Sequence, residues 1–188
     1  MCYLIIGFLF LGCSSLSKEP GRPPKVGEKI IEDRLRLLYI HNFQNDSYAP
    51  ALHTMLTQVL KAEVDRRGRF IQTRDKSLAM YRLYGKVIHF QRIGNLLDMG
   101  NQEMSSEITA VIRLELQEVG GERLTLERDE ILGRVYFSDQ LGYRETEEQA
   151  QARLVNNLAI RICQEMENAW YYHVKEKYYK NTKEIEKF

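Results

Sequence analysis

The chain has 188 residues, a length typical of one domain with short appendages. Its 27 Lys and Arg residues nearly balance 26 Asp and Glu residues, and this formal net charge of +1 argues against a dedicated nucleic-acid-binding protein, which usually has a strongly basic domain. Apolar residues make up 44% of the chain and charged residues 28%, as in globular proteins. Cys2, Cys13 and Cys163 are too few for a disulfide scaffold and lack the paired spacing of a zinc site.

The N-terminal segment has the pattern of a secretion signal. Residues 1–12 carry no charge, but the run is shorter than the about 20 apolar residues that a membrane-spanning helix needs. The run ends in Gly12-Cys13-Ser14, which resembles a bacterial lipobox, and in such a signal the cysteine is acylated and the chain is cut before it. The alternative is an ordinary signal peptide, or a buried strand with an incidental Cys13.

The composition divides the remaining chain into three parts. Residues 13–27 contain three of the four prolines, and we expect the lipidated Cys13 and a flexible tether there. Residues 28–175 carry the periodic apolar patterns of a folded domain. Residues 176–188 are predicted to be a charged C-terminal tail.

The first half of the domain predicts a strand followed by a helix. Residues 29–41 alternate with a period of two, with Leu35, Leu37 and Tyr39 on one side, which indicates a strand. From Tyr48 to Val64, apolar residues recur every three or four positions, which indicates a helix. Helix boundary signals flank that stretch: Ser47 or Asp46 as the N-cap, Pro50 in the first turn, and Gly68 as the stop.

The second half predicts three antiparallel strands and a long helix. The run 80–92 alternates with Tyr81, Leu83, Val87 and His89 on one face. A second run has Ile108, Ala110, Ile112, Leu114 and Leu116 on one face, Gly120-Gly121 makes a tight hairpin, and a third run covers 124–137 with Ile131, Val135 and Phe137 facing inward. Thr146 and Gln149 have capping-box spacing, so a helix is predicted to begin there.

These elements predict an α+β fold, with two helices packed on one face of a four-stranded, mostly antiparallel sheet. The amphipathic helices bury one face of the sheet, and the other face is expected to stay open.

The order of these features resembles the LptE family of lipopolysaccharide-assembly lipoproteins. The resemblance rests on the Gly12-Cys13 lipobox, on Tyr39-Ile40-His41-Asn42-Phe43 at the end of the first strand, on Leu83-Tyr84-Gly85-Lys86-Val87, and on the long C-terminal helix. It implies an outer-membrane lipoprotein on the periplasmic side that plugs an LptD-type β-barrel. It also implies contact with lipopolysaccharide, and Arg134 falls where relatives carry a basic residue.

Five basic residues are predicted on the open face of the sheet: Arg82, Lys86, Arg92, Arg113 and Arg134. Clustered cations bind phosphate oxygens, so these residues are the candidate glycolipid-binding set. The alternative is an ordinary solvated face.

Two further segments carry open alternatives. The apolar tip with Leu96, Leu97 and Met99 either inserts into a partner or lipid, or folds back onto the nearby helix. The mixture of aromatic residues and lysines that follows Trp170 is typical either of an interfacial segment or of a fraying helix end.

Catalysis finds little support in the sequence. The four histidines are scattered and no metal or nucleophile motif occurs, so we expect no enzyme activity, no metal and no cofactor. The main alternative to the barrel plug is a periplasm-facing lipoprotein that binds another lipid or envelope component, and an enzyme with a dispersed Arg, Tyr and Glu site is the remaining rival.

Overall fold

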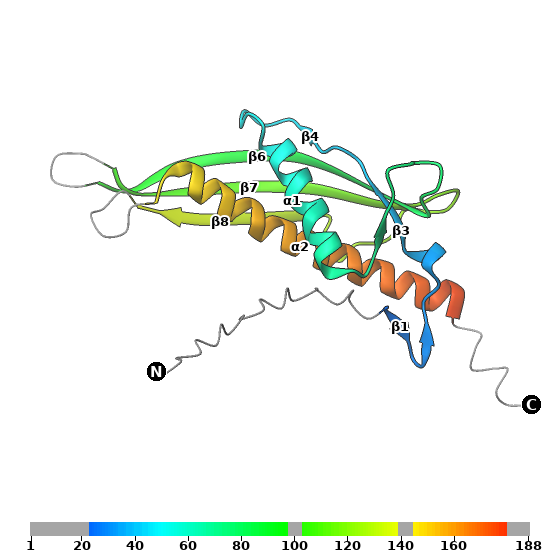
Figure 1. Cartoon of the computed structure of the whole chain (residues 1–188). Coiled ribbons are helices and arrows are strands. Elements are labelled where there is room, and N and C mark those ends of the chain that lie inside the picture. Colours follow the sequence, from blue (N-terminus) through cyan, green and yellow to red (C-terminus); the bar gives the residue numbers. More distant parts are fainter. Residues whose placement is uncertain (1–22, 98–102, 139–144, 180–188) are drawn as a thin grey trace, which may run out of the picture.

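The computed structural model describes residues 23–97, 103–138 and 145–179, so Cys13, Met99 and residues 180–188 lie outside the described part. Eleven elements follow one another in this part (Figure 1). They are β1 (Lys25–Val26), β2 (Lys29–Ile30), the 3-10 helix η1 (Asp33–Arg36), β3 (Leu37–Ile40), β4 (Gln44–Asn45), α1 (Leu52–Arg67), β5 (Ile71–Gln72), β6 (Tyr81–Leu97), β7 (Glu103–Glu118), β8 (Glu130–Phe137) and α2 (Glu147–Tyr179).

The main sheet is mixed and has six strands, which corrects the prediction of four mostly antiparallel strands. Its order is β5-β3-β6-β7-β8, and β4 pairs with β6 beyond the end of β3. The β6–β7 and β7–β8 pairs are antiparallel, whereas β3 is parallel to both β5 and β6, and β4 is parallel to β6. Parallel pairing becomes possible because α1 and its flanking loops carry the chain back between β3 and β6.

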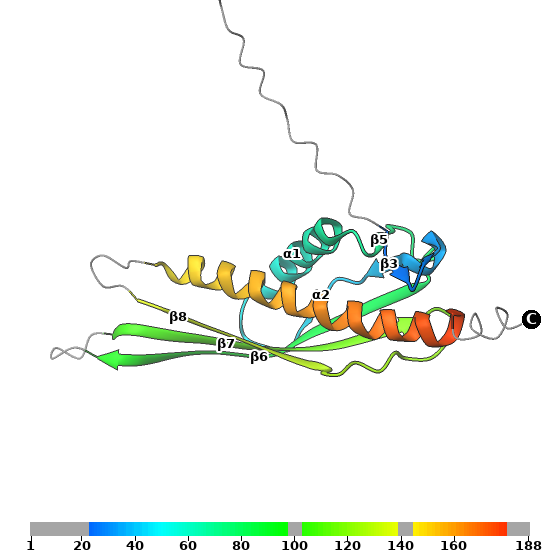
Figure 2. The same ribbon diagram turned by 90° about the horizontal axis from the view of Figure 1, so that it is seen from below.

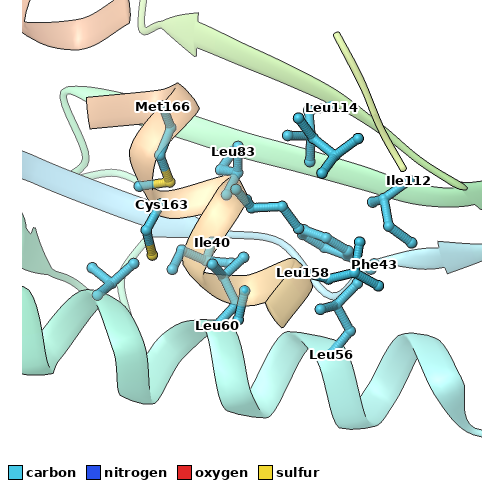
Figure 3. Close-up of a cluster of buried hydrophobic side chains, with 14 of the residues drawn as sticks. Ile40, Phe43, Leu56, Leu60, Leu83, Ile112, Leu114, Leu158, Cys163 and Met166 are labelled. Atoms are coloured by element: carbon cyan, nitrogen blue, oxygen red, sulfur yellow. The ribbon is translucent and has the colours of Figure 1, made fainter. Parts of the chain in front are cut away.

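Both long helices pack on the same face of the sheet, as predicted (Figure 2). Helix α2 runs along β7 and β8, and α1 crosses it over β4 and β6. The core lies between these layers: Leu56 and Leu60 come from α1, Cys163 and Met166 from α2, and Leu83 from β6 (Figure 3). All five side chains are buried, and burial raises the pKa of the Cys163 thiol to about 12, so Cys163 is a packing residue.

Helix α1 ends as predicted but begins differently. Gly68 has φ +66° and its N–H donates to the Val64 carbonyl, which is the predicted glycine stop. Neither Asp46 nor Ser47 caps the helix. The Asp46 carboxylate lies 3.0 Å from Lys86 Nζ, and the hydroxyl and the N–H of Ser47 both donate to the side-chain oxygen of Asn45. The N-cap position is Ala51, in the left-handed region at φ +60°.

A β-bulge in β6 changes the facing of its second half. The register with β7 shifts between Val87 and His89, so Phe90 is buried where the alternation predicts His89, which is exposed. One extra residue in a strand reverses the facing of every residue after it.

The first predicted strand is also shorter, and its buried side is the one that carries Leu38. Only Leu37–Ile40 joins the main sheet, because η1 interrupts the run at Asp33–Arg36. Leu38 and Ile40 are buried toward the helices, whereas Leu37 and Tyr39 are half-buried on the other side.

The chain segments next to the predicted domain boundaries are ordered parts of the domain. Lys25 and Val26, which the sequence assigns to the tether, pair with β2, and Ile31 N–H donates to the Pro24 carbonyl. At the other end, α2 continues to Tyr179, four residues into the predicted tail.

The N-terminus of α2 is the predicted capping box. The Thr146 hydroxyl accepts from the Gln149 N–H at 3.2 Å, and the Gln149 side chain accepts from the Thr146 N–H at 3.0 Å.

Candidate functional site: the open face of the sheet

The face of the sheet opposite the helices is formed by alternate residues of β3, β6, β7 and β8. The register places these residues in rows across the strands: Tyr39–Arg82–Gln117, Tyr84–Glu115, Lys86–Arg113–Glu130, His89–Val111–Leu132, Gln91–Thr109–Arg134 and Ile93–Glu107–Tyr136. No helix covers this face in the described part of the chain (Figure 2). It is therefore the candidate binding surface.

Four of the five predicted basic residues lie on this face, and three of them form an ion pair. Lys86 Nζ is 3.0 Å from an Asp46 oxygen, Arg113 Nη2 is 2.7 Å from a Glu130 oxygen, and Arg134 Nε is 2.8 Å from a Glu107 oxygen. The side chains of Arg113 and Arg134 remain about half exposed, at 56% and 51%. An anion arriving at these residues therefore competes with a carboxylate that is already in place.

Arg134 has the most enclosed acidic partner of the three. The side chain of Glu107 is 15% exposed, whereas the partners of Lys86 and Arg113 are 57% and 45% exposed. The Tyr136 hydroxyl and the Glu107 carboxylate raise the pKa of Arg134, so its guanidinium stays charged at any physiological pH. The position combines a permanent cation with an aromatic neighbour.

Arg82 lies at the other end of the open face, beside a small aromatic cluster. His41 stacks on Tyr84 with ring centroids 4.1 Å apart, and Tyr39 contacts His41 edge-on at 4.7 Å. Arg82 donates to the Lys76 carbonyl at 3.3 Å, and its buried Nε has no hydrogen-bond partner in the described part of the chain. Burial, together with the charges of Lys76 and Arg82, lowers the pKa of His41, which favours the neutral imidazole at pH 7.

Arg92 is not on the open face, which corrects the sequence prediction. The bulge between Val87 and His89 turns it to the helix side, where it pairs across the strands with buried Ile108. Its Nε lies 3.4 Å from a Glu147 oxygen at the start of α2, and its guanidinium carbon lies 5.8 Å from the centre of the Phe137 ring. The remaining four basic residues share the open face, spread along its length.

Apolar side chains on the open face surround the Arg134–Glu107 pair. Ile93, Leu132 and Tyr136 are 43%, 45% and 56% exposed. Ile93 and Tyr136 lie in the row of Glu107, and Leu132 lies in the row next to that of Arg134. The sequence prediction for this face names only its basic residues, and not Ile93, Leu132 or Tyr136. Leu132 could have been noticed, because it occupies the same alternation phase as Arg134.

A second polar cluster, which the sequence analysis missed, joins the end of β7 to the end of α2. The Glu118 side chain is 3% exposed; it accepts from Lys177 and the Tyr178 hydroxyl, and its other near contact is His173 at 3.3 Å. Burial opposes ionisation of Glu118, but the bonds from Lys177 and Tyr178 prevail and lower its pKa. Gly121 leaves room for this carboxylate, because a Cβ there would lie 2.5 Å from a Glu118 oxygen.

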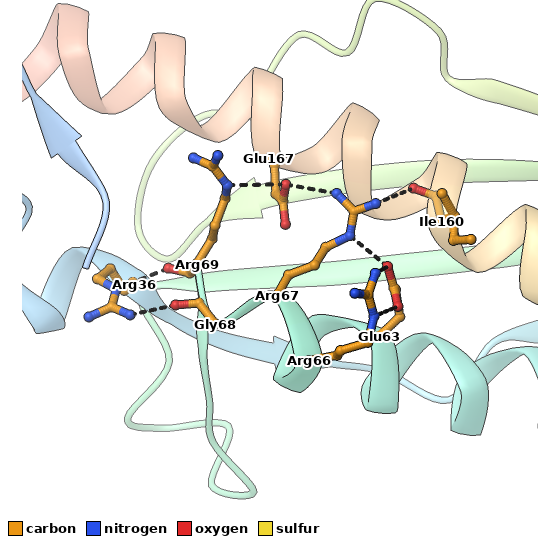
Figure 4. A network of polar contacts seen from close by, with 8 residues as sticks. All are labelled: Arg36, Glu63, Arg66, Arg67, Gly68, Arg69, Ile160 and Glu167. Atoms are coloured by element: carbon orange, nitrogen blue, oxygen red, sulfur yellow. Dashed lines mark hydrogen bonds and ion pairs between the residues drawn. The ribbon is translucent and has the colours of Figure 1, made fainter. Parts of the chain in front are cut away.

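A third cluster links the two helices (Figure 4). Arg67 donates to Glu63 on α1 at 2.7 Å and to Glu167 on α2 at 3.1 Å, and Arg69 Nε lies 3.5 Å from Glu167. Burial raises the pKa of Glu167, whereas bonds from Arg66 chiefly lower that of Glu63 to about 2. These groups satisfy one another and hold α1 against α2.

The described residues contain no group of three or more His, Cys, Asp or Glu side chains that could hold a metal ion. Tip residues Leu96 and Leu97 belong to the end of β6. Among residues 23–97, 103–138 and 145–179, no helix is both long enough and apolar enough to cross a membrane.

Known proteins resemble this chain in fold and not in sequence. No family model matches the chain. No curated protein sequence matches it either. A hypothetical protein from Chlamydia trachomatis has a similar structure, with a TM-score of 0.51 and 8% identity over 71% of this chain and 96% of that chain. This likeness shows a shared fold.

Two further similar structures are of lipoproteins. Rare lipoprotein B from Shewanella oneidensis has a TM-score of 0.46 and 13% identity, covering 70% of this chain and 94% of that one. A minor lipoprotein from Acinetobacter baumannii has a TM-score of 0.45 and 13% identity, covering 70% and 92%.

Proposed function

We propose that this protein is an outer-membrane lipoprotein, anchored through Cys13 on the periplasmic side, that plugs and supports an LptD-type β-barrel in lipopolysaccharide transport. The observation that carries the proposal is the Gly12-Cys13 lipobox, followed by a proline-rich tether and an α+β domain in the order typical of the LptE family. The protein is proposed to act by binding its partners and not by catalysis.

The contacts within the domain give a physical role to two segments on which the resemblance rests. Phe43 follows β3 and Gly85 lies in β6, and a Cβ on Gly85 would lie 2.3 Å from the Phe43 ring. The Phe43 N–H donates to the Thr57 hydroxyl of α1 at 3.0 Å. The glycine therefore makes room for an aromatic ring that ties the sheet to α1.

The test is a pull-down of the full-length protein from its native membrane, combined with the intact mass of the released chain. We expect a chain that begins at an acylated Cys13 and that brings a large β-barrel protein with it. An acylated chain that is stably folded, monomeric and never associated with a barrel would overturn the plug.

A second candidate function is that of an envelope lipoprotein that binds another lipid or envelope component on the open face. The apolar residues Ile93, Leu132 and Tyr136 favour it, because exposed apolar groups beside a cation suit an amphipathic ligand. Recovery of lipid with a barrel-free monomer in the same pull-down would support this function over the plug.

A further inference from the structure

The end of the domain that receives the tether carries exposed apolar and cationic side chains from two elements. On the β1–β2 hairpin, Ile30 is 56% exposed and lies opposite Lys25, which is also exposed. On the last turns of α2, Tyr172 is 64% exposed and Lys175 is exposed. We call Lys25, Ile30, Tyr172 and Lys175 the tether-end surface.

The two elements of the tether-end surface are in contact. The Tyr179 hydroxyl, at the end of α2, donates to the Ile30 carbonyl at 3.4 Å. Tyr172 is seven residues before Tyr179, two helical turns, so both lie on the same side of α2. Trp170 and Val174, two residues to either side of Tyr172 and so on the opposite side of this helix, are buried in the core, so Tyr172 faces away from the core. The hairpin and α2 meet at this end in both views (Figures 1 and 2).

The length of the tether limits how far this surface is from the bilayer. About ten residues separate Cys13 from Pro23, and even a fully extended chain of that length reaches only about 35 Å. A tether this short keeps the local concentration of the domain at the bilayer high, so that a weak contact is enough to hold it there.

We propose that the tether-end surface docks on the bilayer that holds the lipid anchor, with Ile30 and Tyr172 entering the interface and the Lys25 and Lys175 side chains reaching the headgroups. Aromatic and aliphatic side chains flanked by lysines are the composition that membrane interfaces accept. This inference rests on the lipid anchor of the proposed function, and it adds a fixed orientation of the domain on the membrane.

The charges around the tether-end surface nearly cancel. Insertion of its apolar side chains and the short tether therefore hold this surface on the bilayer, and long-range electrostatic attraction does not. Three exposed lysines, Lys25, Lys29 and Lys175, are nearly matched by two exposed carboxylates, Glu28 and Glu176. A contact with so little net charge depends weakly on ionic strength, so we expect it to persist at high salt.

The experiment uses the acylated full chain in vesicles of phosphatidylethanolamine and phosphatidylglycerol. A polarity-sensitive fluorophore is attached in separate variants I30C and Y172C, and in the control Y48C. Tyr48 is 72% exposed, and its ring contacts Phe90 on the helix side of β6, so it lies off the open face. Phe90 is joined through Ala110 to Gly133, which packs on Leu158 of α2, about 20 Å along the helix from Tyr172. Cys163 is buried and does not compete for the label.

We expect the emission of the labels at 30 and 172 to shift to shorter wavelength in vesicles, with the label at 48 unchanged, at low and at high salt. The docking would be overturned if the labels at 30 and 172 emit as they do in water, on chains that float with the vesicles and carry the acyl mass. The lipid anchor would still be supported by that result. An equal shift at all three positions would also overturn it. A chain without the acyl mass would overturn the anchor and the docking together.

Discussion

At the scale of single residues, the Arg134–Glu107 pair gives the sharpest test of glycolipid contact. The Glu107 carboxylate already pairs with the Arg134 guanidinium at 2.8 Å. Removal of the Glu107 charge therefore frees Arg134 to bind a phosphate. We expect R134Q to weaken binding of purified lipopolysaccharide by about tenfold and E107Q to strengthen it, since a charged hydrogen bond is worth about 1.5–3 kcal/mol. Binding is measured by fluorescence titration.

Arg92 provides the matched control for this pair. It has the same side chain and is a member of the same predicted set, but it points to the helix side and contacts Glu147 and Phe137. We expect R92Q to leave the affinity unchanged. Equal weakening by R92Q and R134Q would show that the open face has no special role.

Glu118 gives a pH-dependent prediction. Its pKa in the folded protein is lowered, so its contribution to stability is fully present above its ordinary pKa of about 4.5 and is lost as the pH falls through the lower folded value. We expect E118Q to reduce the free energy of unfolding by about 1–3 kcal/mol at pH 7, and we expect this difference from the wild type to shrink below pH 4.5. Urea unfolding at a series of pH values measures it.

E122Q is the control for the Glu118 prediction, since Glu122 is a nearby exposed carboxylate. It should follow the wild-type curve at every pH. Comparison between variants also cancels the contribution of Glu167, whose raised pKa acts in the opposite direction. A difference between E118Q and wild type that stays constant from pH 7 to pH 3 would contradict the assigned ionisation.

At the scale of elements, α2 packs closely against β8. A Cβ on Gly133 would meet Leu154 and Leu158 of α2 at 2.8 Å, so the glycine sets the distance between helix and sheet. Arg153 and Arg161 of α2 donate to the Tyr136 and Leu132 carbonyls of the same strand at 2.7 and 2.5 Å. These bonds cover carbonyls on the outer edge of the sheet.

We therefore expect G133A to lower the free energy of unfolding by about 1–3 kcal/mol, because one added methyl group pushes α2 away from β8. L132A, at the neighbouring exposed position of the same strand, should stay within about 0.5 kcal/mol of wild type. Chemical denaturation of both variants provides the measurement. A G133A protein as stable as wild type would show that α2 moves freely on the sheet.

The sequence predicts the features whose causes are local. The Gly68 stop, the Thr146–Gln149 capping box and the inward face of β7 all depend on residues a few positions apart. The features that were not predicted depend on a choice between two patterns that the sequence allows equally well. In β6 the alternation can continue unbroken through Ile88 and His89, or it can contain one extra residue there, and no residue type near them indicates the extra residue.

The wrong facing of Arg92 is a direct result of that missed bulge, and the candidate site was therefore predicted with one member too many. The ion pairs of Lys86 and Arg134 were also out of reach of the sequence, because they join β6 to Asp46, the residue after β4, and β8 to β7. The parallel pairing of β3 with β6 is a long-range choice of the same kind, and no local pattern encodes it.

At the scale of the whole molecule, the proposed anchor separates two cysteines by function. We expect C13S to lose the acyl mass, because no other cysteine in the mature chain is accessible for acylation. Cys163 is buried in the core, so C163S should keep the acyl mass. Intact mass of the two purified variants checks both. An acyl mass that persists on C13S would contradict the anchor.

One hydrogen bond has a consequence for how the molecule is made. The indole N–H of Trp170 donates to the Leu35 carbonyl at 2.8 Å and so joins two residues that are 135 positions apart. Contacts of such long range slow folding, and the first part of the domain lacks its support until the last helix exists. A nascent chain that ends before residue 170 therefore lacks this bond and the packing of the last helix, and the first part of the domain is held in place only after that helix has been made.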